Sequence, residues 1–329
     1  MNVYDLIIVG GGPVGLFAAF YAGRRHMKTL VIEAADTLGG LPYSLYSEKW
    51  ILDVPGFSQI TGYDLSQKLI EQAQSDMLTV MTSTQVLSCE GDLSQGFIVS
   101  CQRDGKPVHI KTASILLATG MGKITPRKMN VPGEDRFFSH GLDYSLRSLD
   151  EARGKRVVIT GGGDSALDWA DMLDGVAAEV RLVHRREDFR AQEESVRRLK
   201  ASGVILHLNS QITSILGDQV VEGVEVLNDQ KIKQTYPCDK VIVSFGAKIQ
   251  LETFTSWGLC MEEGGLLVNN AMETNKPGIF AAGDVVYTPG VGSTKLIAIG
   301  FAQGVIAVNT AKTRIDPQAR FFPGHSTAW

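Results

Sequence analysis

The chain has 329 residues, which is too long for one ordinary hydrophobic core, so two domains are expected. Hydrophobic residues make up 44% and charged residues 21%, and the net charge of −4 excludes a strongly basic nucleic-acid-binding protein. No apolar run reaches the length of a membrane span, and the first strand begins too early to leave room for a signal peptide, so a cytoplasmic protein is expected.

The beginning of the chain predicts a dinucleotide-binding fold. Residues 6–9 indicate a short buried strand, and Gly10, Gly12 and Gly15 follow it in a G-x-G-x-x-G turn. Such a turn brings backbone N–H groups against a pyrophosphate at a helix N-terminus. Pro13 suits the first turn of that helix, because no N–H donor is needed there.

Glu33 ends the next predicted strand. An acid at this place hydrogen-bonds a ribose hydroxyl of an adenine dinucleotide. The loop that follows, residues 34–57, is long for a simple connection, and long loops in compact domains tend to hold ligands.

Further elements complete the first region. Residues 63–77 predict an amphipathic helix, and residues 80–110 predict antiparallel strands with hairpin turns. Residues 114–120 predict a buried strand that closes the region. The composition then changes at residues 121–134, which indicates a crossover into another domain.

The second domain opens with another copy of the first pattern. Residues 156–160 predict a strand, and Gly161 and Gly163 lie in its turn. Ala166 stands where the first copy has its third glycine, which is allowed because that position only has to be small. Two copies of the pattern predict two bound dinucleotides.

The residue that reads the ribose differs between the two copies. Gly10 to Glu33 and Gly161 to His184 both span 23 positions, so the second copy replaces the acid with a run that begins His184, Arg185, Arg186. Guanidinium groups bind a 2′-phosphate bidentately, whereas an acid repels it. The second copy is therefore predicted to bind NADP(H), and the first is left for FAD.

Arg190 lies one helical turn beyond Arg186 if a helix follows, and it then adds a further donor to the same site. The alternative interpretation of these arginines is a solvated basic face.

The end of the chain returns to the first domain. Residues 203–243 predict further strands, and Gly246 suits a crossover back. A buried strand at residues 278–284 ends in Asp284, which is placed to hold polyol hydroxyls or, alternatively, to cap a turn. Residues 295–314 predict a helix.

These elements predict an α/β fold class with two Rossmann-like (three-layer ββα) dinucleotide-binding domains, the second inserted into the first. Residues 1–119 and 247–329 are expected to form the FAD-binding domain, and residues 120–246 the NADP(H)-binding domain. The aromatic-rich tail, residues 321–329, is expected to dock, by stacking on a cofactor, by packing across a dimer interface or by joining the core.

The cysteines indicate neither a metal site nor a redox pair. They are Cys89, Cys101, Cys238 and Cys260, which show no C-x-x-C spacing and no histidine partners. Ordinary packing is expected for all of them.

Taken together, these motifs resemble the low-molecular-weight thioredoxin reductases and, within that group, the thioredoxin-reductase-like ferredoxin–NADP(+) reductases of bacteria. The resemblance covers essentially the whole chain and is carried by residues 10–15, 45–57, 161–168, 184–191, 281–284 and 325–327. A thioredoxin reductase carries a C-x-x-C pair shortly after a Pro-Gly-Glu turn, whereas this chain has no cysteine in residues 138–145. Without a dithiol there is no route for two electrons into a disulfide.

The resemblance implies a ferredoxin–NADP(+) reductase. In such an enzyme FAD mediates electron transfer between NADPH and ferredoxin or flavodoxin, by hydride transfer to flavin N5 and then single-electron steps. The resemblance also implies a homodimer, with no nucleic-acid or membrane partner. Two other functions remain open, namely an NADPH diaphorase or oxidase with another acceptor and a flavin- and NADP-binding redox sensor without turnover.

The resemblance also implies roles for individual residues. Trp50 is similar to the aromatic residue that stacks on one face of the isoalloxazine, His325 to the tail residue that covers the other face, and Ser326 then lies near flavin N5. Asp53 is similar to the acid beside the pyrimidine end of the flavin. Two residues depart from the family pattern, because Leu41 replaces the usual Gln and Trp50 the usual Tyr.

Overall fold

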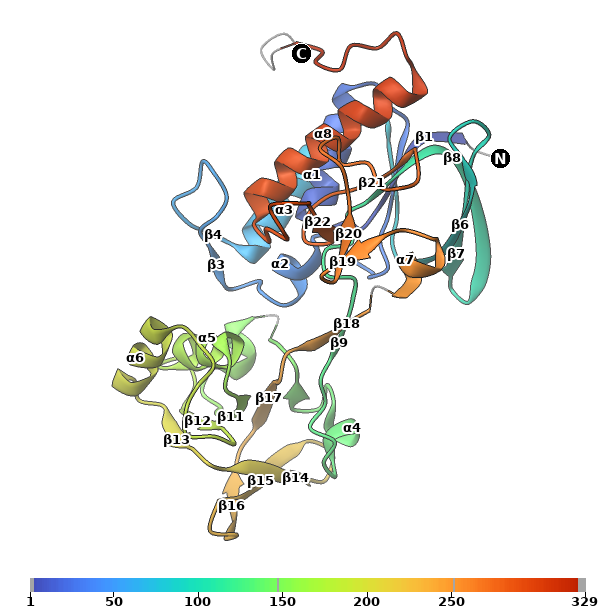
Figure 1. Ribbon diagram of the computed structural model, residues 1–329. Helices are drawn as coiled ribbons and strands as arrows, with labels where there is room; N and C mark the ends of the chain where they lie inside the picture. The colour runs from blue at the N-terminus through green and yellow to red at the C-terminus, as the bar shows by residue number, and fades with distance from the viewer. Residues whose placement is uncertain (1–2, 147, 251, 325–329) are drawn as a thin grey trace. The chain divides into compact units, whose positions relative to one another are not determined.

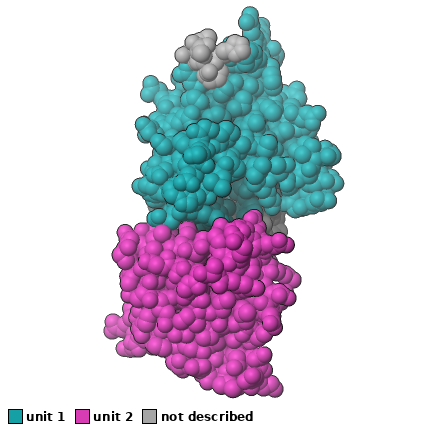
Figure 2. Space-filling view, turned by 90° about the vertical axis from the view of Figure 1, so that its left-hand side faces the viewer, with its two compact units in different colours: residues 1–123, 249–329 teal, residues 124–248 magenta. Residues whose placement is uncertain are grey.

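The computed structural model describes residues 3–146, 148–250 and 252–324 (Figure 1). The chain divides into two compact units, which Figure 2 shows in different colours. Unit 1 comprises residues 1–123 and 249–329, and unit 2 comprises residues 124–248. Each unit has its own sheet with parallel strands at the centre, which confirms the predicted fold class. No described helix is both long and apolar enough to cross a membrane.

Unit 1 is built on a seven-stranded sheet of order β5-β2-β1-β8-β7-β6, with β21 also paired to β8. The strands of unit 1, including those of its smaller sheets, are β1 Val3–Val9, β2 Thr29–Ile32, β3 Trp50–Ile51, β4 Ile60–Thr61, β5 Leu78–Met81, β6 Thr84–Asp92, β7 Gly96–Arg103, β8 Lys106–Leu117, β19 Met261–Glu262, β20 Gly265–Leu267, β21 Ile279–Ala281 and β22 Val286–Tyr287. Its helices are α1 Pro13–Arg24, α2 Gly40–Ser44, α3 Gly62–Ala73, α7 Glu252–Ser256 and α8 Ile297–Ile315.

Strand β8 differs from its prediction. The last hairpin strand and the buried strand predicted at residues 114–120 form one continuous strand of 12 residues. Its first part pairs antiparallel with β7, and its last part pairs parallel with β21, while β1 runs parallel along its other edge. The change from exposed to buried residues along β8 therefore reflects a change of neighbours within one strand.

Strand β5 is a second difference. Antiparallel strands were predicted from residue 80 onward, but β5 is parallel to β2, with Val31 paired to Val80. Helix α3 precedes β5 and returns the chain to the start of the sheet, as a parallel crossover requires. Alternation of polar and apolar residues does not carry this information about direction.

Helices α1, α3 and α8 lie side by side over the sheet of unit 1 (Figure 1). The predicted helix at residues 295–314 is confirmed as α8, and its Gly300 and Gly304 lie where it crosses α1. A Cβ at Gly300 would overlap the side chain of Val14, so the glycine allows the two helices to approach closely. This packing holds the start of α8 beside the start of α1.

Unit 2 is built on a five-stranded parallel sheet of order β10-β17-β11-β12-β13, joined by the three-stranded antiparallel sheet β14-β15-β16. Its elements are α4 Glu134–Phe137, β10 Leu142–Asp143, η1 Leu149–Ala152, β11 Arg156–Gly161, α5 Asp164–Leu173, β12 Glu179–Val183, α6 Glu193–Ala201, β13 Ile205–His207, β14 Gln211–Gly217, β15 Val221–Leu227, β16 Lys233–Pro237 and β17 Lys240–Ser244. Strands β9 Lys123–Pro126 and β18 Ala247–Gln250 pair with each other where the chain passes between the units.

Candidate functional site

The glycine turn of unit 1 contains glycines of two kinds. Gly10 has a φ of 110°, and a Cβ there would overlap the carbonyl oxygen of Ala118; a Cβ at Gly15 would overlap the carbonyl oxygen of Gly10. The fold itself requires these two glycines. Gly12 is different, because its φ is −79° and the one described atom that its added Cβ would meet is the Cα of Gly40, at 3.7 Å.

The described residues therefore leave the space in front of Gly12 open to a side chain or a ligand. Gly12 is the N-cap of α1 and has no side-chain cap, and Pro13 occupies the first helical position. The first-turn N–H groups of a helix and its dipole attract anions. Neither the backbone conformation nor the packing of the protein requires a glycine at position 12. A glycine at an uncapped helix start therefore fits a pyrophosphate that approaches the backbone closely.

Glu33 holds the glycine turn of unit 1 in place. Its carboxylate accepts hydrogen bonds from the backbone N–H of Gly11 (2.7 Å) and of Ala35 (2.8 Å). The carbonyl oxygen of Gly11 accepts from the N–H of Gly39 (2.8 Å). The predicted ribose-reading acid and the predicted ligand loop are thus both brought to the turn, and Gly40 packs against Gly12.

Asp53 and Asp284 lie together at the start of α8. The Asp53 carboxylate accepts a hydrogen bond from the backbone N–H of Ile297, the first residue of α8, at 2.8 Å. Burial raises the pKa of Asp284, and the nearby Asp53 carboxylate adds to this rise, whereas Lys295 opposes it. The structure therefore gathers two of the predicted flavin ligands, separated by 231 positions (284 − 53), at one helix N-terminus.

Gln303 is a residue of this region that sequence reasoning missed. Its side-chain oxygen accepts a hydrogen bond from the N–H of Gly283, at 2.8 Å. This bond fixes the backbone directly before Asp284. A glutamine in the middle of an apolar helix was the only available signal.

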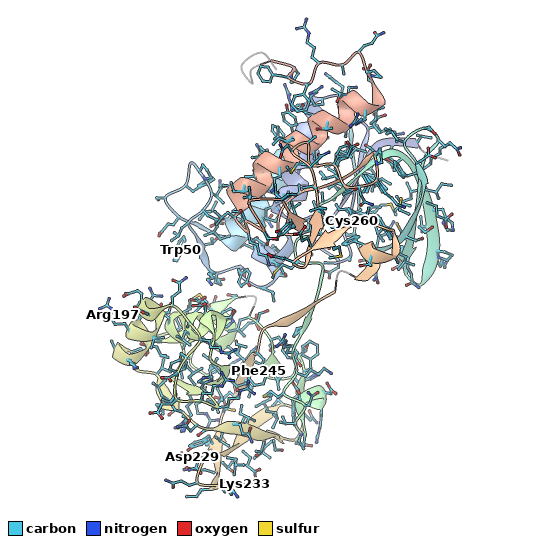
Figure 3. All side chains as sticks on the ribbon, in the orientation of Figure 1. Trp50, Arg197, Asp229, Lys233, Phe245 and Cys260 are labelled. Carbon is cyan, nitrogen blue, oxygen red and sulfur yellow. The ribbon has the colours of Figure 1, made fainter. Side chains whose placement is uncertain are left out.

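Trp50 and the tail residues are placed less fully. Trp50 lies in the short hairpin of β3 and β4, and 56% of its surface is exposed (Figure 3). His325 and Ser326 lie outside the described residues. The segment before them is fastened by the buried Arg25, whose guanidinium donates to the carbonyl oxygens of Arg320 (2.7 Å) and Phe321 (2.9 Å).

The glycine turn of unit 2 also contains glycines that the fold requires and one that it does not. A Cβ at Gly161 would lie 2.5 Å from the carbonyl oxygen of Ser244, and a Cβ at Gly162 would overlap the imidazole of His184. Gly163 has a φ of −105°, caps α5 without a side-chain bond, and would bring its Cβ no closer than 3.6 Å to any protein atom, the nearest being the carbonyl oxygen of Arg190. Gly163 is therefore the counterpart of Gly12.

The basic run after β12 separates into a buried residue and exposed ones. The His184 ring is buried, stacks on Phe189 (5.1 Å between ring centroids) and has its Nε2 3.1 Å from the carbonyl oxygen of Asp188. Arg185 and Arg186 are exposed, and among the described residues their guanidinium groups have no hydrogen-bond or ion-pair partner. The two arginines are free to bind an anion, whereas the imidazole packs against the turn.

Arg190 reaches the same turn by a route other than the predicted one. No helix is present over residues 186–190; residues 185–188 bend instead, and α6 begins at Glu193. The N–H of Arg190 donates to the carbonyl oxygen of Gly162, at 2.7 Å. The exposed Arg190 side chain is therefore placed by a bridge to the glycine turn.

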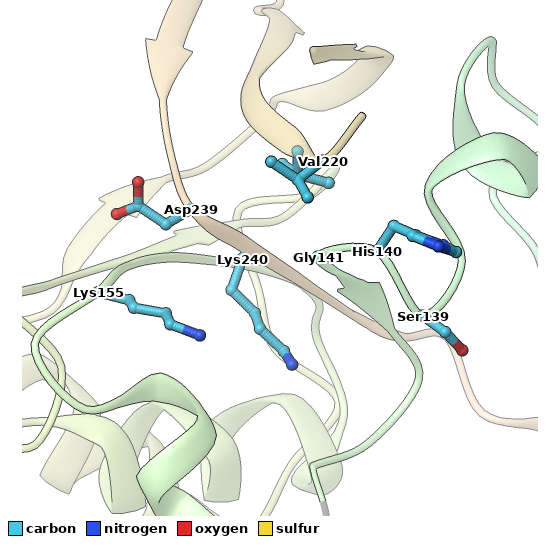
Figure 4. A pocket seen from close by; sticks show the side chains of 8 residues that line it. Ser139, His140, Gly141, Lys155, Val220, Asp239 and Lys240 are labelled. Atoms are coloured by element: carbon cyan, nitrogen blue, oxygen red, sulfur yellow. The ribbon is translucent and has the colours of Figure 1, made fainter. Parts of the chain in front are cut away.

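A separate hollow lies at the other edge of the parallel sheet of unit 2, where β11 and β17 begin (Figure 4). Its most buried charge is Lys240, whose ammonium group is already paired with Asp143 (3.0 Å) and Glu151 (2.9 Å). The hollow therefore offers no buried unpaired cation for a ligand.

The four cysteines are free thiols. Burial raises the pKa of Cys89 to about 11, of Cys101 to about 11 and of Cys238 to about 12. Thiols with such pKa values carry almost no thiolate at neutral pH, and the thiolate is the reactive form. The fourth, Cys260, is exposed.

The chain is similar to known proteins over nearly its full length. A family model described as pyridine nucleotide-disulphide oxidoreductase matches residues 4–307. A ferredoxin–NADP reductase of Metallosphaera sedula is 41% identical, with 99% of this chain and 98% of the relative covered. A ferredoxin–NADP reductase of Shouchella clausii is 43% identical, with the same coverage of 99% and 98%.

The solved structures to which the chain is similar include thioredoxin reductases. The thioredoxin reductase of Lactococcus lactis is 28% identical, with a TM-score of 0.75 and with 95% of this chain and 99% of that chain covered. The thioredoxin reductase of T. acidophilum is 25% identical, with a TM-score of 0.77 and the same coverage of 95% and 99%.

Proposed function

Because the chain belongs to the pyridine nucleotide-disulphide oxidoreductase family, and is therefore an oxidoreductase, we propose that it is a ferredoxin–NADP(+) reductase. In this proposal it transfers electrons between NADPH and a ferredoxin through bound FAD. A flavodoxin as a further acceptor, a homodimeric assembly and a location in the cytoplasm belong to the same proposal.

The observation that carries the proposal is the absence of a dithiol from a chain with this fold. The sequence contains no C-x-x-C pair, and three of the four thiols have pKa values raised to about 11 or 12 by burial. Disulfide reduction requires a reactive thiolate and a second thiol. The relatives named ferredoxin–NADP reductase, at 41% and 43% identity, support the acceptor that the missing dithiol leaves available.

The proposal places FAD in unit 1 and NADP(H) in unit 2. The cradle at Gly12 fits the pyrophosphate of FAD, with Glu33 at the adenosine side, and the start of α8 carries Asp284 and Asp53 for the polyol and the pyrimidine end. Bound FAD supplies the chemistry that the protein lacks, because a flavin accepts a hydride and releases electrons singly. The N-terminus of α8 favours negative charge at the site.

Unit 2 is proposed to select the phosphorylated nicotinamide cofactor. The cradle at Gly163 fits its pyrophosphate, and the exposed guanidinium groups of Arg185, Arg186 and Arg190, which have no partner among the described residues, are proposed to bind its 2′-phosphate. His184 supports this site because its buried imidazole packs against Gly162. Guanidinium is suited to this task by its fixed fork of donors.

Three residues complete the proposed flavin site by resemblance. Trp50 is proposed to stack on one face of the isoalloxazine, as its exposure on the β3–β4 hairpin permits. His325 and Ser326 are proposed to cover the opposite face and to lie near N5. The bonds from Arg25 to residues 320 and 321 support a defined position for the start of this tail.

The experiment that tests the function compares acceptors. Purified holoenzyme is supplied with NADPH and with a ferredoxin, a flavodoxin, thioredoxin or no added acceptor, and NADPH oxidation is followed. The proposal predicts fast turnover with ferredoxin and none with thioredoxin. Equal NADPH oxidation with and without ferredoxin indicates an oxidase or diaphorase, and flavin reduction without turnover indicates a redox sensor; either result contradicts the proposal.

A further inference from the structure

Two side-chain hydroxyl groups in residues 3–146, 148–250 and 252–324 are buried without a hydrogen bond. They are Oγ1 of Thr119 and Oγ of Ser244, and they are the buried side-chain nitrogen or oxygen atoms without a partner in the described part of the chain. A polar atom that has lost its water and gained no partner is costly, and natural structures contain few of them. Each of these hydroxyls therefore requires an explanation.

Each hydroxyl lies beside the first glycine of a turn, although the two places are one residue apart in register. The counterpart of Ser244 in unit 1 is Ala118, because the carbonyl oxygens of Ala118 and Ser244 are the atoms that a Cβ at Gly10 and at Gly161 would meet first. Thr119 follows the carboxyl end of β8, and its Cα would lie 3.1 Å from a Cβ at Gly10. Ser244 ends β17 and is paired in register with Gly161, the first glycine of the other turn. Each unit thus places a hydroxyl residue against the first glycine of its own turn.

These places lie at the switch points of the two sheets. In unit 1 the chain passes from β1 to β2 and β5 on one side, whereas β8 lies on the other side of β1. In unit 2 it passes from β11 to β12 and β13 on one side, whereas β17 lies on the other. Ligands of open α/β sheets bind in the crevice at such a point, outside the carboxyl ends of the strands.

The side of the crevice identifies the part of the ligand. Glu33 ends the β2 side of unit 1, and Arg185 and Arg186 end the β12 side of unit 2, so the adenosine half belongs on those sides. With the pyrophosphate at the helix start, the other half of each dinucleotide passes along the β8 or β17 side. Thr119 and Ser244 are partly exposed residues whose oxygens point inward. A hydroxyl at either residue reaches a ligand outside the strands by rotation about χ1, which is a change between staggered rotamers.

We propose that Thr119 and Ser244 donate hydrogen bonds to the non-adenine halves of the two dinucleotides, Thr119 to the flavin mononucleotide half of FAD and Ser244 to the nicotinamide riboside half of NADP(H). The inference rests on the proposed function, because it takes FAD and NADP(H) as the two ligands. Each bond satisfies a hydroxyl that has no partner among the described residues.

The test for Ser244 compares two ligands of the holoenzyme. Ser244→Ala is expected to raise the dissociation constant of NADP+ by about 3- to 10-fold, the loss of one ordinary hydrogen bond, and to leave that of 2′,5′-ADP unchanged. The probe 2′,5′-ADP lacks the nicotinamide half. Ser244→Thr keeps the hydroxyl and is expected to bind NADP+ like the original chain.

A matched control is available in unit 2. Ser210 is also buried, but its hydroxyl already donates to the carbonyl oxygen of Leu208 at 2.7 Å, so Ser210→Ala is expected to leave both dissociation constants unchanged. Unchanged NADP+ binding by Ser244→Ala overturns the inference while the proposed function stands. Equal weakening of NADP+ and 2′,5′-ADP also overturns it, because the serine then acts on the fold. A wild-type holoenzyme that binds neither ligand overturns the proposed function itself.

The test for Thr119 uses flavin release. Thr119→Val replaces the hydroxyl with a methyl group of similar size, and it is expected to speed the release of FAD from diluted holoenzyme by about 3- to 10-fold, measured by the rise in flavin fluorescence. Thr119→Ser is expected to restore slow release. Ser114→Ala in β8 is the control, because the Ser114 hydroxyl already donates to the carbonyl oxygen of Asp5 at 2.7 Å. Release at the wild-type rate from Thr119→Val, or equally fast release from Ser114→Ala, refutes the role.

Discussion

Substitution of alanine at Gly12 separates what the glycine turn does for the fold from what it does for the ligand. The φ of Gly12 is −79°, which alanine adopts without strain, and its Cβ would lie 3.7 Å from the Cα of Gly40, an ordinary contact. Alanine at an N-cap destabilises the fold by several tenths of a kcal/mol relative to glycine. Alanine also lowers the conformational entropy of the unfolded chain, which stabilises the fold by about 0.4–1 kcal/mol. The apoprotein of Gly12→Ala is therefore expected to keep its unfolding free energy within about 1 kcal/mol.

The effect on FAD is expected to be much larger. The new methyl group lies where the pyrophosphate approaches the backbone, and it removes at least one hydrogen bond to a charged group. Such a bond contributes about 1.5–3 kcal/mol, so the affinity for FAD is expected to fall by about 10- to 150-fold. The assays are urea unfolding of the apoprotein and the rate of flavin release from the holoenzyme.

Two comparisons make the result decisive. Gly15→Ala places its Cβ onto the carbonyl oxygen of Gly10, so this variant is expected to lose fold stability as well as FAD. Gly163→Ala, the equivalent change in unit 2, is expected to weaken NADP+ binding and to leave FAD release unchanged. If Gly12→Ala retains FAD as firmly as the original chain, the reasoning that assigns its open space to a pyrophosphate is refuted.

Three further predictions concern charge and thiol chemistry. Arg186→Ala is expected to raise the KM for NADPH by about 10-fold, through the loss of a bond between charged groups, and to leave the KM for NADH unchanged. Substitution of the exposed Arg197, which is already paired with Glu194, provides the control. Equal effects of Arg186→Ala on both nucleotides would contradict the 2′-phosphate role. Cys260 is expected to be the only thiol that reacts rapidly with a maleimide at pH 7.5, counted by intact mass, and rapid labelling of more than one thiol would count against the burial of the others. Hydrogen bonds from Arg156 lower the pKa of Asp239 to about 2, so this carboxylate contributes stability that is complete above about pH 4 and is lost as the pH falls toward 2. The Asp239 side chain is 40% exposed and solvent screens its pair, so Asp239→Asn is expected to cost no more than about 1 kcal/mol at pH 7 in urea unfolding, and a difference that persists unchanged to pH 2 would contradict this origin.

The features that the sequence predicts well are local ones. The two glycine turns, the strands before them and helix α8 follow from spacing and periodicity within about 25 residues, which is the range over which a pattern can be recognised without a structure. Arg25 shows the opposite case. It directly follows the end of α1 and is buried against Asn309 and the carbonyl oxygens of residues 320 and 321, and nothing in α1 indicates these distant partners.

The errors have a related cause. Arg186 and Arg190 have the spacing of one helical turn, but the carbonyl oxygen of Gly162 accepts the N–H of Arg190 and favours a bridge over a helix. Strand β8 reads as two elements because its neighbours change along its length. In both cases a contact far away in sequence decides the local conformation, which propensity alone does not describe.

The residue at the end of the second strand has the same structural role in both units, although its chemistry differs. In unit 1 the Glu33 carboxylate accepts from the N–H of Gly11, the middle glycine of the turn; in unit 2 the His184 imidazole packs on Gly162, the corresponding glycine. Each residue therefore fixes its turn against the sheet. Because the imidazole is buried in doing so, the exposed charge of unit 2 moves one position along the chain, to Arg185 and Arg186. A change in cofactor preference can thus arise beside the position that supports the turn, without loss of the support itself.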